Sequence, residues 1–283
     1  MLKRFRLEEP ESVAEVSELL GRFGDSAKVY AGGTELLLAM KEGLVDYERL
    51  INVKNLKGLN EVNAANGTIK IGALCTHHQL ECSTALKDKL PSLVKLEQNV
   101  ANVRVRQAGT IGGNLCFAEP HADPGTLLIA LGGTMVAEKS SAKREIAAAD
   151  FFVDAYETSL AADEVLTEIR IPTPTANSHS AYLKFGYLER PSVGVAVAFN
   201  LNGGSLSNVK IAVGCAGPAP RRVEEAEALL EGKSTAEAQR SLAQAGAIAG
   251  RASEAISDLH GSQDYKEHIV GVLLKRAFQS AIS

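Results

Sequence analysis

Residues 105–126 read VRQAGTIGGNLCFAEPHADPGT, and the glycine turn at their centre constrains the chain more than any other feature. Paired glycines let the backbone turn tightly with no Cβ in the way, so successive N–H groups can point at an anion. Thr110 and Asn114 flank the pair and could add hydrogen bonds to phosphate oxygens. Asp123 and Pro124 follow as the predicted N-cap acid and first residue of an apolar helix. An acid there would accept from a sugar hydroxyl, so the stretch predicts a nucleotide site.

A second glycine turn strengthens this prediction. Residues 28–42 read KVYAGGTELLLAMKE, which predicts a short strand, a glycine turn and a helix with Thr34 at its N-cap. The turn again aims backbone donors at one point, which favours an anion. Neither G-x-G-x-x-G nor G-x-x-x-x-G-K-[ST] occurs, so neither a Rossmann site nor a P-loop is supported. The two turns could instead hold one diphosphate from two sides, although a glycine pair is more often only a turn.

Turn and linker signals divide the chain into three units, residues 1–56, 57–174 and 178–283. The first alternates strands and helices, which predicts a small α/β layer. The second starts with a hairpin around Asn66-Gly67 and combines helices with alternating strands. The proline-containing residues 172–175 form a linker. After it, three antiparallel strands precede a helical region, so we expect an α+β fold with a three-stranded C-terminal sheet.

Composition excludes several other classes of protein. The 283 residues carry a net charge of −4 and no basic patch interleaved with aromatic side chains, which argues against nucleic acid as a partner. No apolar run reaches the ~18 residues of a transmembrane helix. Residues 1–12 lack the apolar stretch of a signal peptide. We therefore expect a cytoplasmic protein without a transmembrane segment.

The cysteines predict no metal site. They are widely spaced, with no C-x-x-C pair, which is poor for an iron–sulfur cluster or structural zinc. Residues 75–82, CTHHQLEC, match no common zinc spacing, and a short helix capped by Thr76 explains them better. Glu119, His121 and Asp123 form another possible ligand set, for which a polar loop is the better interpretation. The four cysteines are Cys75, Cys82, Cys116 and Cys215.

Three stretches together resemble a known family. AGGTELLLAMKEG at 31–43, IGALCTH at 71–77 and RQAGTIGGNL…ADPGTLL at 106–128 resemble the FAD-binding medium subunit of molybdenum hydroxylases. That family includes carbon monoxide dehydrogenase and the flavin portion of xanthine dehydrogenase, and the resemblance covers essentially the whole chain. It implies a two-subdomain FAD-binding domain of the PCMH/VAO-like type, with FAD in the cleft, and a C-terminal domain of the CO dehydrogenase flavoprotein type.

The resemblance also implies which residues hold the cofactor. It places a backbone contact to adenine at Leu166, or at Thr167 if the alignment slides by one, and the ribose-side acid at Asp123. Lys184 would lie beside the flavin and stabilise the anionic reduced ring, whereas composition alone suggests an exposed strand residue. The family's Gln-Ile-Arg-Asn before the second turn is replaced by residues 104–107, RVRQ. The two phosphate turns would comprise Ala31, Gly32, Gly33, Thr34, Glu35 and Leu36, and Thr110, Ile111, Gly113 and Asn114.

No residue of the chain resembles a catalytic nucleophile or triad, so FAD would carry the chemistry. No histidine or cysteine lies within the glycine turns, which predicts non-covalent FAD. The resemblance implies an electron-transfer subunit that takes electrons from a small [2Fe-2S] subunit and passes them to an external acceptor. A large molybdenum-cofactor subunit would complete a trimer, and two trimers would pair.

The substrate of such a complex and its electron acceptor stay open, and so do two other interpretations. A stand-alone flavin oxidoreductase would need a histidine or tyrosine base facing the flavin. A non-enzymatic assembly subunit would bind the nucleotide only for structure.

Overall fold

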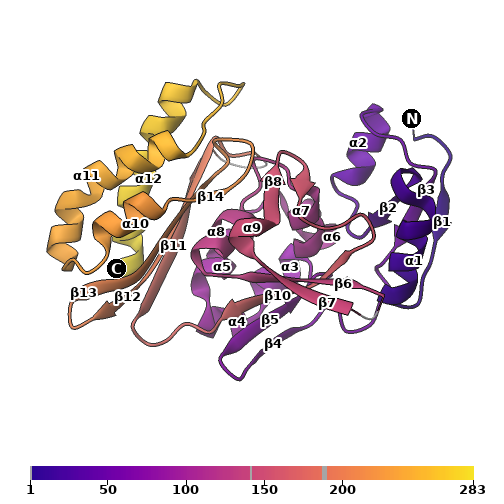
Figure 1. Ribbon diagram of the computed structural model, residues 1–283, viewed down its shortest axis with the longest axis horizontal. Helices are drawn as coiled ribbons and strands as arrows, with labels where there is room; N and C mark the ends of the chain where they lie inside the picture. The colour runs from indigo at the N-terminus through magenta and orange to yellow at the C-terminus, as the bar shows by residue number, and fades with distance from the viewer. Residues whose placement is uncertain (1, 141, 187–189) are drawn as a thin grey trace.

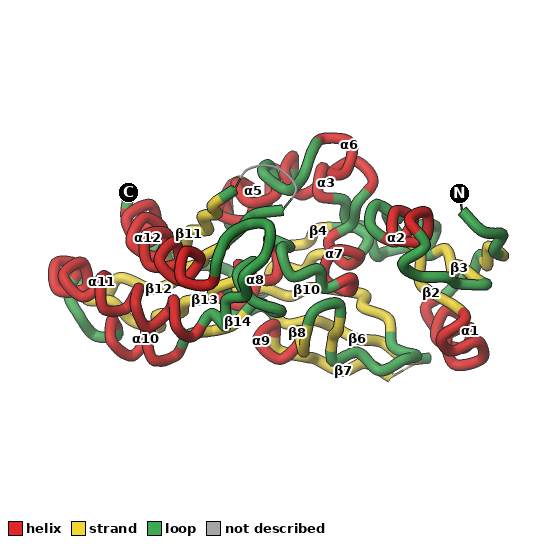
Figure 2. Tube along the Cα trace, turned by 90° about the horizontal axis from the view of Figure 1, so that it is seen from above, coloured by secondary structure: helices red, strands yellow, loops and turns green. Residues whose placement is uncertain are grey.

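The computed structural model describes residues 2–140, 142–186 and 190–283. Three units with separate sheets follow one another along the long axis, and the two termini lie at opposite ends (Figures 1 and 2). The mixture of strand-rich and helix-rich units confirms the predicted α+β class.

The first unit has a three-stranded parallel sheet in the order β1-β3-β2. Parallel neighbours need crossover connections, and the helices supply them. Ser12 caps the first helix, because its side chain accepts from the backbone N–H of Glu15 at 3.2 Å. The cap predicted at Thr34 is wrong, since α2 begins at Leu36 after Glu35. The elements are β1 (Arg6–Glu8), α1 (Val13–Phe23), η1 (Gly24–Ser26), β2 (Ala27–Tyr30), α2 (Leu36–Glu42) and β3 (Arg49–Asn52).

The second unit is built on a five-stranded antiparallel sheet in the order β4-β5-β10-β6-β7. Its hairpin turns at Asn66-Gly67 as predicted, with both residues at positive φ. Thr76 caps α3 as predicted, and a second short helix, α4, follows at once with Ser83 as its cap. The elements are β4 (Val62–Ala65), β5 (Thr68–Gly72), α3 (His77–Cys82), α4 (Thr84–Lys89), α5 (Pro91–Glu97), α6 (Val103–Ala108), α7 (Ile111–Phe117), α8 (Pro124–Ala130), β6 (Thr134–Lys139), β7 (Ala142–Ala147), α9 (Ala148–Phe151), β8 (Phe152–Asp154), β9 (Glu157–Thr158) and β10 (Val165–Pro172).

Helices α6 and α7 were not expected from the sequence. Helix α7 contains the glycine pair of the main motif, which was predicted to be a turn. The motif is the first turn of a helix rather than an open loop, because Thr110 caps α7 through the N–H of Gly113 at 3.0 Å. Two adjacent glycines have poor helix propensity, which concealed this helix in the sequence. Leu115 and Ile111 are buried on its inner face and anchor it to the central core.

The third unit has a sheet of four strands in the order β11-β12-β13-β14, not the three that were predicted. The additional strand is only two residues long, too short to leave a pattern in the sequence. Helices α11 and α12 pack closely where Gly246 meets Gly271; a Cβ at Gly246 would lie 2.8 Å from the Cα of Gly271. The elements are β11 (Ser178–Phe185), β12 (Val193–Asn202), β13 (Ser205–Gly214), β14 (Arg221–Arg222), α10 (Glu224–Leu230), α11 (Thr235–Ala252) and α12 (Gln263–Ile282).

Helix α8 joins the second and third units. It is buried along its whole length, and it contacts both β12 and β13. Ala196 and Ala212, on these two strands, belong to the same hydrophobic core as the central sheet. The C-terminal unit is therefore anchored to the wall that carries the second glycine motif. Within the described ranges, no helix is both long enough and apolar enough to span a bilayer.

Candidate cofactor site

A cavity of about 580 Å³ lies between the first and second units. Both glycine motifs contribute to its walls, as does Arg190 from the C-terminal part of the chain. Of the thirteen predicted cofactor-binding residues, two do not line it, Ile111 and Lys184. The eleven that do are Ala31, Gly32, Gly33, Thr34, Glu35, Leu36, Thr110, Gly113, Asn114, Asp123 and Leu166.

The first glycine turn supplies backbone donors to this cavity. Within the described residues, the N–H groups of Gly32, Gly33, Thr34 and Leu36 have no acceptor. Gly33 has φ of +72°, a conformation that side chains other than glycine rarely adopt. Four unpaired N–H groups in one turn form a concave set of donors suited to an anionic oxygen. The turn therefore has donors available for an anion, and phosphate binding there stays a prediction.

Gly32 brings the two glycine motifs into contact. A Cβ built on Gly32 would lie 2.4 Å from the carbonyl oxygen of Ala108 and 2.7 Å from the Cα of Gly109. These are backbone atoms, so they cannot move aside as a flexible side chain would. Glycine is required here because the backbones of the two units approach closely at the cavity wall.

The second motif does not offer the bare N–H groups that were predicted. The N–H of Ile111 donates to the carbonyl of Cys75 at 2.9 Å, and that of Gly112 to Ala73 at 2.9 Å. A Cβ on Gly112 would lie 2.6 Å from the Cβ of Ala73, so this glycine serves packing. The prediction of an open anion nest is wrong for this motif, because carbonyl groups in the segment after β5 already accept hydrogen bonds from these N–H groups. Ile111 itself is fully buried in the core.

The second motif instead contributes the side chain of Asn114. Its Oδ1 atom is buried and has no hydrogen-bond partner among the described residues. Leaving such an acceptor unsatisfied costs about 1–3 kcal/mol. Because Asn114 lines the cavity, a donor on a bound ligand would remove this penalty. The hydroxyl of Thr110, which was expected to bind phosphate, already accepts from the N–H of Gly113.

Asp123 does not cap α8 with its side chain, contrary to the prediction. It is buried, and its two oxygens accept from the hydroxyl of Tyr182 at 2.6 Å and from Nζ of Lys184 at 2.8 Å. Burial raises the pKa of Asp123 above its ordinary value, although Lys184 and Tyr182 both act to lower it. A carboxylate has about four acceptor positions. Asp123 can thus still accept from a hydroxyl in the cavity.

Lys184 lies behind Asp123. Its side chain is only 11% exposed, so the alternative of an exposed strand residue is wrong. Its Nζ also donates to the carbonyl of Asn99 at 2.8 Å. Lys184 therefore supplies charge to the cavity wall through Asp123.

The structure distinguishes Leu166 from Thr167. Strand β10 has a bulge here, where its register to β6 shifts between Leu166 and Glu168. Thr167 is turned into the protein: its carbonyl accepts from the N–H of Ala73 at 3.0 Å, and its hydroxyl donates to Val136 at 3.3 Å. Leu166 lines the cavity and Thr167 does not.

Two histidines line the cavity that were not predicted to do so, His77 and His121. The Nδ1 atom of His121 pairs with Glu119 at 2.9 Å, and Nε2 approaches Asp258 at 3.4 Å. Its pKa is raised, chiefly by the hydrogen bond to Glu119. His77 belongs to residues 75–82 and His121 to residues 119–123, the two segments considered as metal sites in the sequence. The acidic residues near each histidine were the signal in the sequence that could have pointed to a functional role. The possible metal ligands Glu119, His121 and Asp123 do not act as one set. Glu119 pairs with His121, whereas Asp123 pairs with Tyr182 and Lys184.

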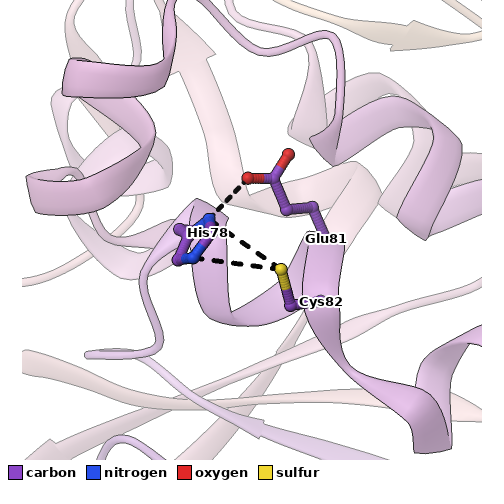
Figure 3. Close-up of side chains that lie close together, drawn as sticks. All are labelled: His78, Glu81 and Cys82. Atoms are coloured by element: carbon purple, nitrogen blue, oxygen red, sulfur yellow. Dashed lines mark hydrogen bonds and ion pairs between the residues drawn. The ribbon is translucent and has the colours of Figure 1, made fainter.

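The cysteine–histidine segment at residues 75–82 does not act as one ligand set either. His78, Glu81 and Cys82 bring ligand-type atoms within 4.8 Å of one another on helix α3 (Figure 3). His78 Nδ1 lies 2.7 Å from one oxygen of Glu81, and the other oxygen is 3.0 Å from Nε of Arg106. Cys75 is not part of this group. Since both oxygens of the carboxylate already have partners, we assign no metal to it.

The cavity wall thus combines free backbone donors, an unsatisfied amide oxygen and a buried carboxylate. The donors match an anionic group such as a diphosphate, and the two acceptors match hydroxyl or amino groups. Its volume lies within the usual range for small-molecule sites, about 300–1,000 Å³. These residues fit a nucleotide such as FAD.

Comparison with known proteins agrees with this chemistry. The family model of the FAD binding domain in molybdopterin dehydrogenase matches residues 3–174, and that of the CO dehydrogenase flavoprotein C-terminal domain matches residues 190–281. The carbon monoxide dehydrogenase medium chain of Hydrogenophaga pseudoflava is 34% identical over 281 residues, covering 98% of this chain and 97% of its own. The nicotine 6-hydroxylase medium subunit of Paenarthrobacter nicotinovorans is 32% identical over 286 residues, covering 99% and 98%.

A solved structure extends the likeness to three dimensions. Carbon monoxide dehydrogenase from Hydrogenophaga pseudoflava, in a form that lacks the Mo-pyranopterin moiety, superposes with a TM-score of 0.95 at 34% identity. The match covers 100% of this chain and 98% of that one. The resemblance noted in the sequence is confirmed: this chain belongs to the family of FAD-binding medium subunits of molybdenum hydroxylases, and it is an oxidoreductase flavoprotein subunit.

Proposed function

We propose that this chain binds FAD non-covalently in the cavity and serves as the electron-transfer subunit between a small [2Fe-2S] subunit and an external acceptor. The observation that carries the proposal is a set of four N–H groups that have no acceptor among the described residues, in a glycine turn that lines a cavity of about 580 Å³. When bound, FAD supplies the redox chemistry. The protein supplies position and charge.

Each part of the wall has a proposed role. The N–H groups of Gly32, Gly33, Thr34 and Leu36 would hold the diphosphate. Asn114 Oδ1 would accept from a cofactor hydroxyl or amine. Asp123 would accept from the nucleotide ribose, with Lys184 keeping it ionised through the 2.8 Å ion pair. The backbone at Leu166 would contact adenine. We assign no catalytic residue to this chain. We retain 1–56, 57–174 and 178–283 as the proposed domain boundaries.

Non-covalent binding is supported by the state of Cys116, the cysteine that lines the cavity. Covalent attachment through sulfur needs a thiolate. Burial raises the pKa of the Cys116 thiol to about 12, with a small opposing effect of Lys28. A thiol in this state is unreactive at neutral pH.

The names of the relatives support the proposed partners. Two of them are called medium chains or subunits, of carbon monoxide dehydrogenase and of nicotine 6-hydroxylase. We propose that this chain likewise assembles with a large molybdenum-cofactor subunit and a small [2Fe-2S] subunit, as a pair of trimers in the cytoplasm.

The alternative of a stand-alone flavin oxidoreductase needs a base beside the flavin. His121 lines the cavity, but both of its ring nitrogens already have partners, Nδ1 with Glu119 at 2.9 Å and Nε2 with Asp258 at 3.4 Å, so neither is directed at a ligand. We therefore favour the electron-transfer role.

The test is to purify the native complex through a tag on this chain and identify the co-purifying subunits by mass spectrometry. Reducing the small subunit should then bleach the flavin absorbance, and an added acceptor should restore it. FAD-loaded chain alone should not oxidise the organic substrate of the complex. Turnover by the isolated chain, or a flavin that its partners do not reduce, contradicts the proposal.

A further inference from the structure

A buried pair of side chains stands in the cavity wall and has no role in the function proposed so far. Nδ1 of His77 lies 2.6 Å from Oε2 of Glu97. The two side chains are 3% and 0% exposed, and His77 lines the cavity. The other carboxyl oxygen, Oε1 of Glu97, is buried with no hydrogen-bond partner among the described residues.

The burial of Glu97 makes this carboxyl group depend on its partner. A lone carboxylate is very costly to bury, and His77 is the only ionic partner of Glu97 in the described structure. Because Glu97 holds Nδ1, Nε2 is the ring nitrogen of His77 that is left to meet a ligand. In an imidazolium that faces the Glu97 carboxylate, Nε2 carries a hydrogen and is a donor.

The His77 ring lies beside the contact between the two glycine motifs. The backbone N–H of His77 donates to the carbonyl of Gly109 at 3.1 Å, which fixes the residue at this contact. A Cβ built on Gly109 would lie 3.3 Å from Cδ2 of His77 and 3.4 Å from Oγ1 of Thr34. Cδ2, the carbon bonded to Nε2, and the Thr34 hydroxyl are thus both close to Gly109, where Gly32 of the first turn also approaches. Within the described residues, Nε2 has no hydrogen-bond partner.

We propose that His77, held by Glu97, is a diphosphate-binding residue whose Nε2–H donates to a phosphate oxygen of the cofactor. The proposal rests on the function given above, since it takes FAD as the ligand. A ligand atom that meets Nε2–H and the neighbouring backbone donors together must be a hydrogen-bond acceptor, and a phosphate oxygen can accept from several donors at once. Glu97 acts through His77 as a positioning residue.

The experiment compares two adjacent histidines on helix α3, since only His77 lines the cavity. His77→Leu is combined with Glu97→Leu, so that no buried charge is left without a partner. Loss of a hydrogen bond to a charged group should weaken FAD binding about 10- to 100-fold. His78→Leu should bind FAD as the parent does. His77→Gln, made together with Glu97→Gln so that no lone carboxylate is buried, has an amide that can donate from about the position of Nε2, and it should restore most of the affinity.

A second readout separates phosphate contact from general damage to the cavity. In the ³¹P NMR spectrum of bound FAD, one diphosphate resonance should move towards its free position in the double Leu variant and return in the double Gln variant. Circular dichroism checks that each variant is folded. The inference is overturned if the double Leu variant binds FAD within twofold of the parent. It is also overturned if affinity falls while both ³¹P resonances stay in place, because His77 then contacts another part of FAD. A parent chain that takes up no FAD would refute the proposed function as well.

Discussion

Replacing Gly32 by alanine tests the contact between the two glycine motifs. The new Cβ would lie 2.4 Å from the Ala108 carbonyl oxygen and 2.7 Å from the Gly109 Cα. Ordinary carbon contacts are about 3.5–4.0 Å, so the backbones must separate by about 1 Å. Overpacking of this kind costs about 1–3 kcal/mol, which lowers the melting temperature by roughly 2–10 °C. The displaced donors should also weaken FAD binding at least tenfold.

Thermal unfolding with and without FAD measures both effects. At a free FAD concentration of about 100 times the parent Kd, binding adds about 2.7 kcal/mol of stability, and a tenfold loss of affinity reduces this to about 1.4 kcal/mol. Gly21→Ala is the matched control, because the nearest atom to its new Cβ is 4.0 Å away and alanine favours helix α1. Its stability should rise slightly, with FAD stabilisation unchanged. If Gly32→Ala melts within 1 °C of the parent and gains the same stability from FAD, the reasoning is refuted.

Three further predictions concern single side chains of the cavity wall. Asn114→Leu removes the unsatisfied Oδ1, so the cofactor-free chain should melt at the same or a higher temperature while FAD affinity falls; lower apo stability with unchanged affinity would contradict this. Lys184→Met leaves Asp123 buried without its cation, which should cost about 3–5 kcal/mol at neutral pH in thermal unfolding, and adding Asp123→Asn should recover most of it. If the double variant recovers no stability, the ion pair between Lys184 and Asp123 is not the cause of the loss. The hydrogen bond from Arg144 lowers the pKa of Glu164 below its ordinary 4.5, so its stabilisation is present above that value and lost as pH falls through the folded pKa. Glu164→Gln should reduce the loss of unfolding free energy on acidification by less than about 1 kcal/mol, since Arg144 is half exposed; an unchanged acid response would show that the pair is not involved.

The sequence allowed prediction of those parts of the site that are formed by residues adjacent in the chain. The first turn needs only two glycines after a strand, and four of its N–H groups have no acceptor among the described residues. The second turn also contains two adjacent glycines, yet its donors are taken by the carbonyls of Ala73 and Cys75, some forty residues earlier in the chain. No local rule reveals that partner. For the second motif, both the predicted open turn and its predicted hydrogen bonding were therefore wrong.

Long-range pairing also explains the other differences. Asp123 before a proline is a good cap signal, but Lys184 and Tyr182, about sixty residues later, take both its oxygens. His77 and Glu97 are twenty residues apart on separate helices, so their pairing left no spacing signal. The sequence shows only a glutamate at the end of the run PSLVKLE, with Lys95 two residues before it. The burial of Glu97 in the fold is what makes a partner necessary.

Non-covalent binding of FAD is tested by the absorbance spectrum of the purified chain and of its supernatant after acid precipitation. We predict flavin bands that correspond to one FAD per chain, with all of the flavin released into the supernatant. The bands should disappear when the flavin is exhaustively removed and return when FAD is added. A colourless chain that takes up no FAD, or a flavin that stays with the precipitate, would contradict this prediction.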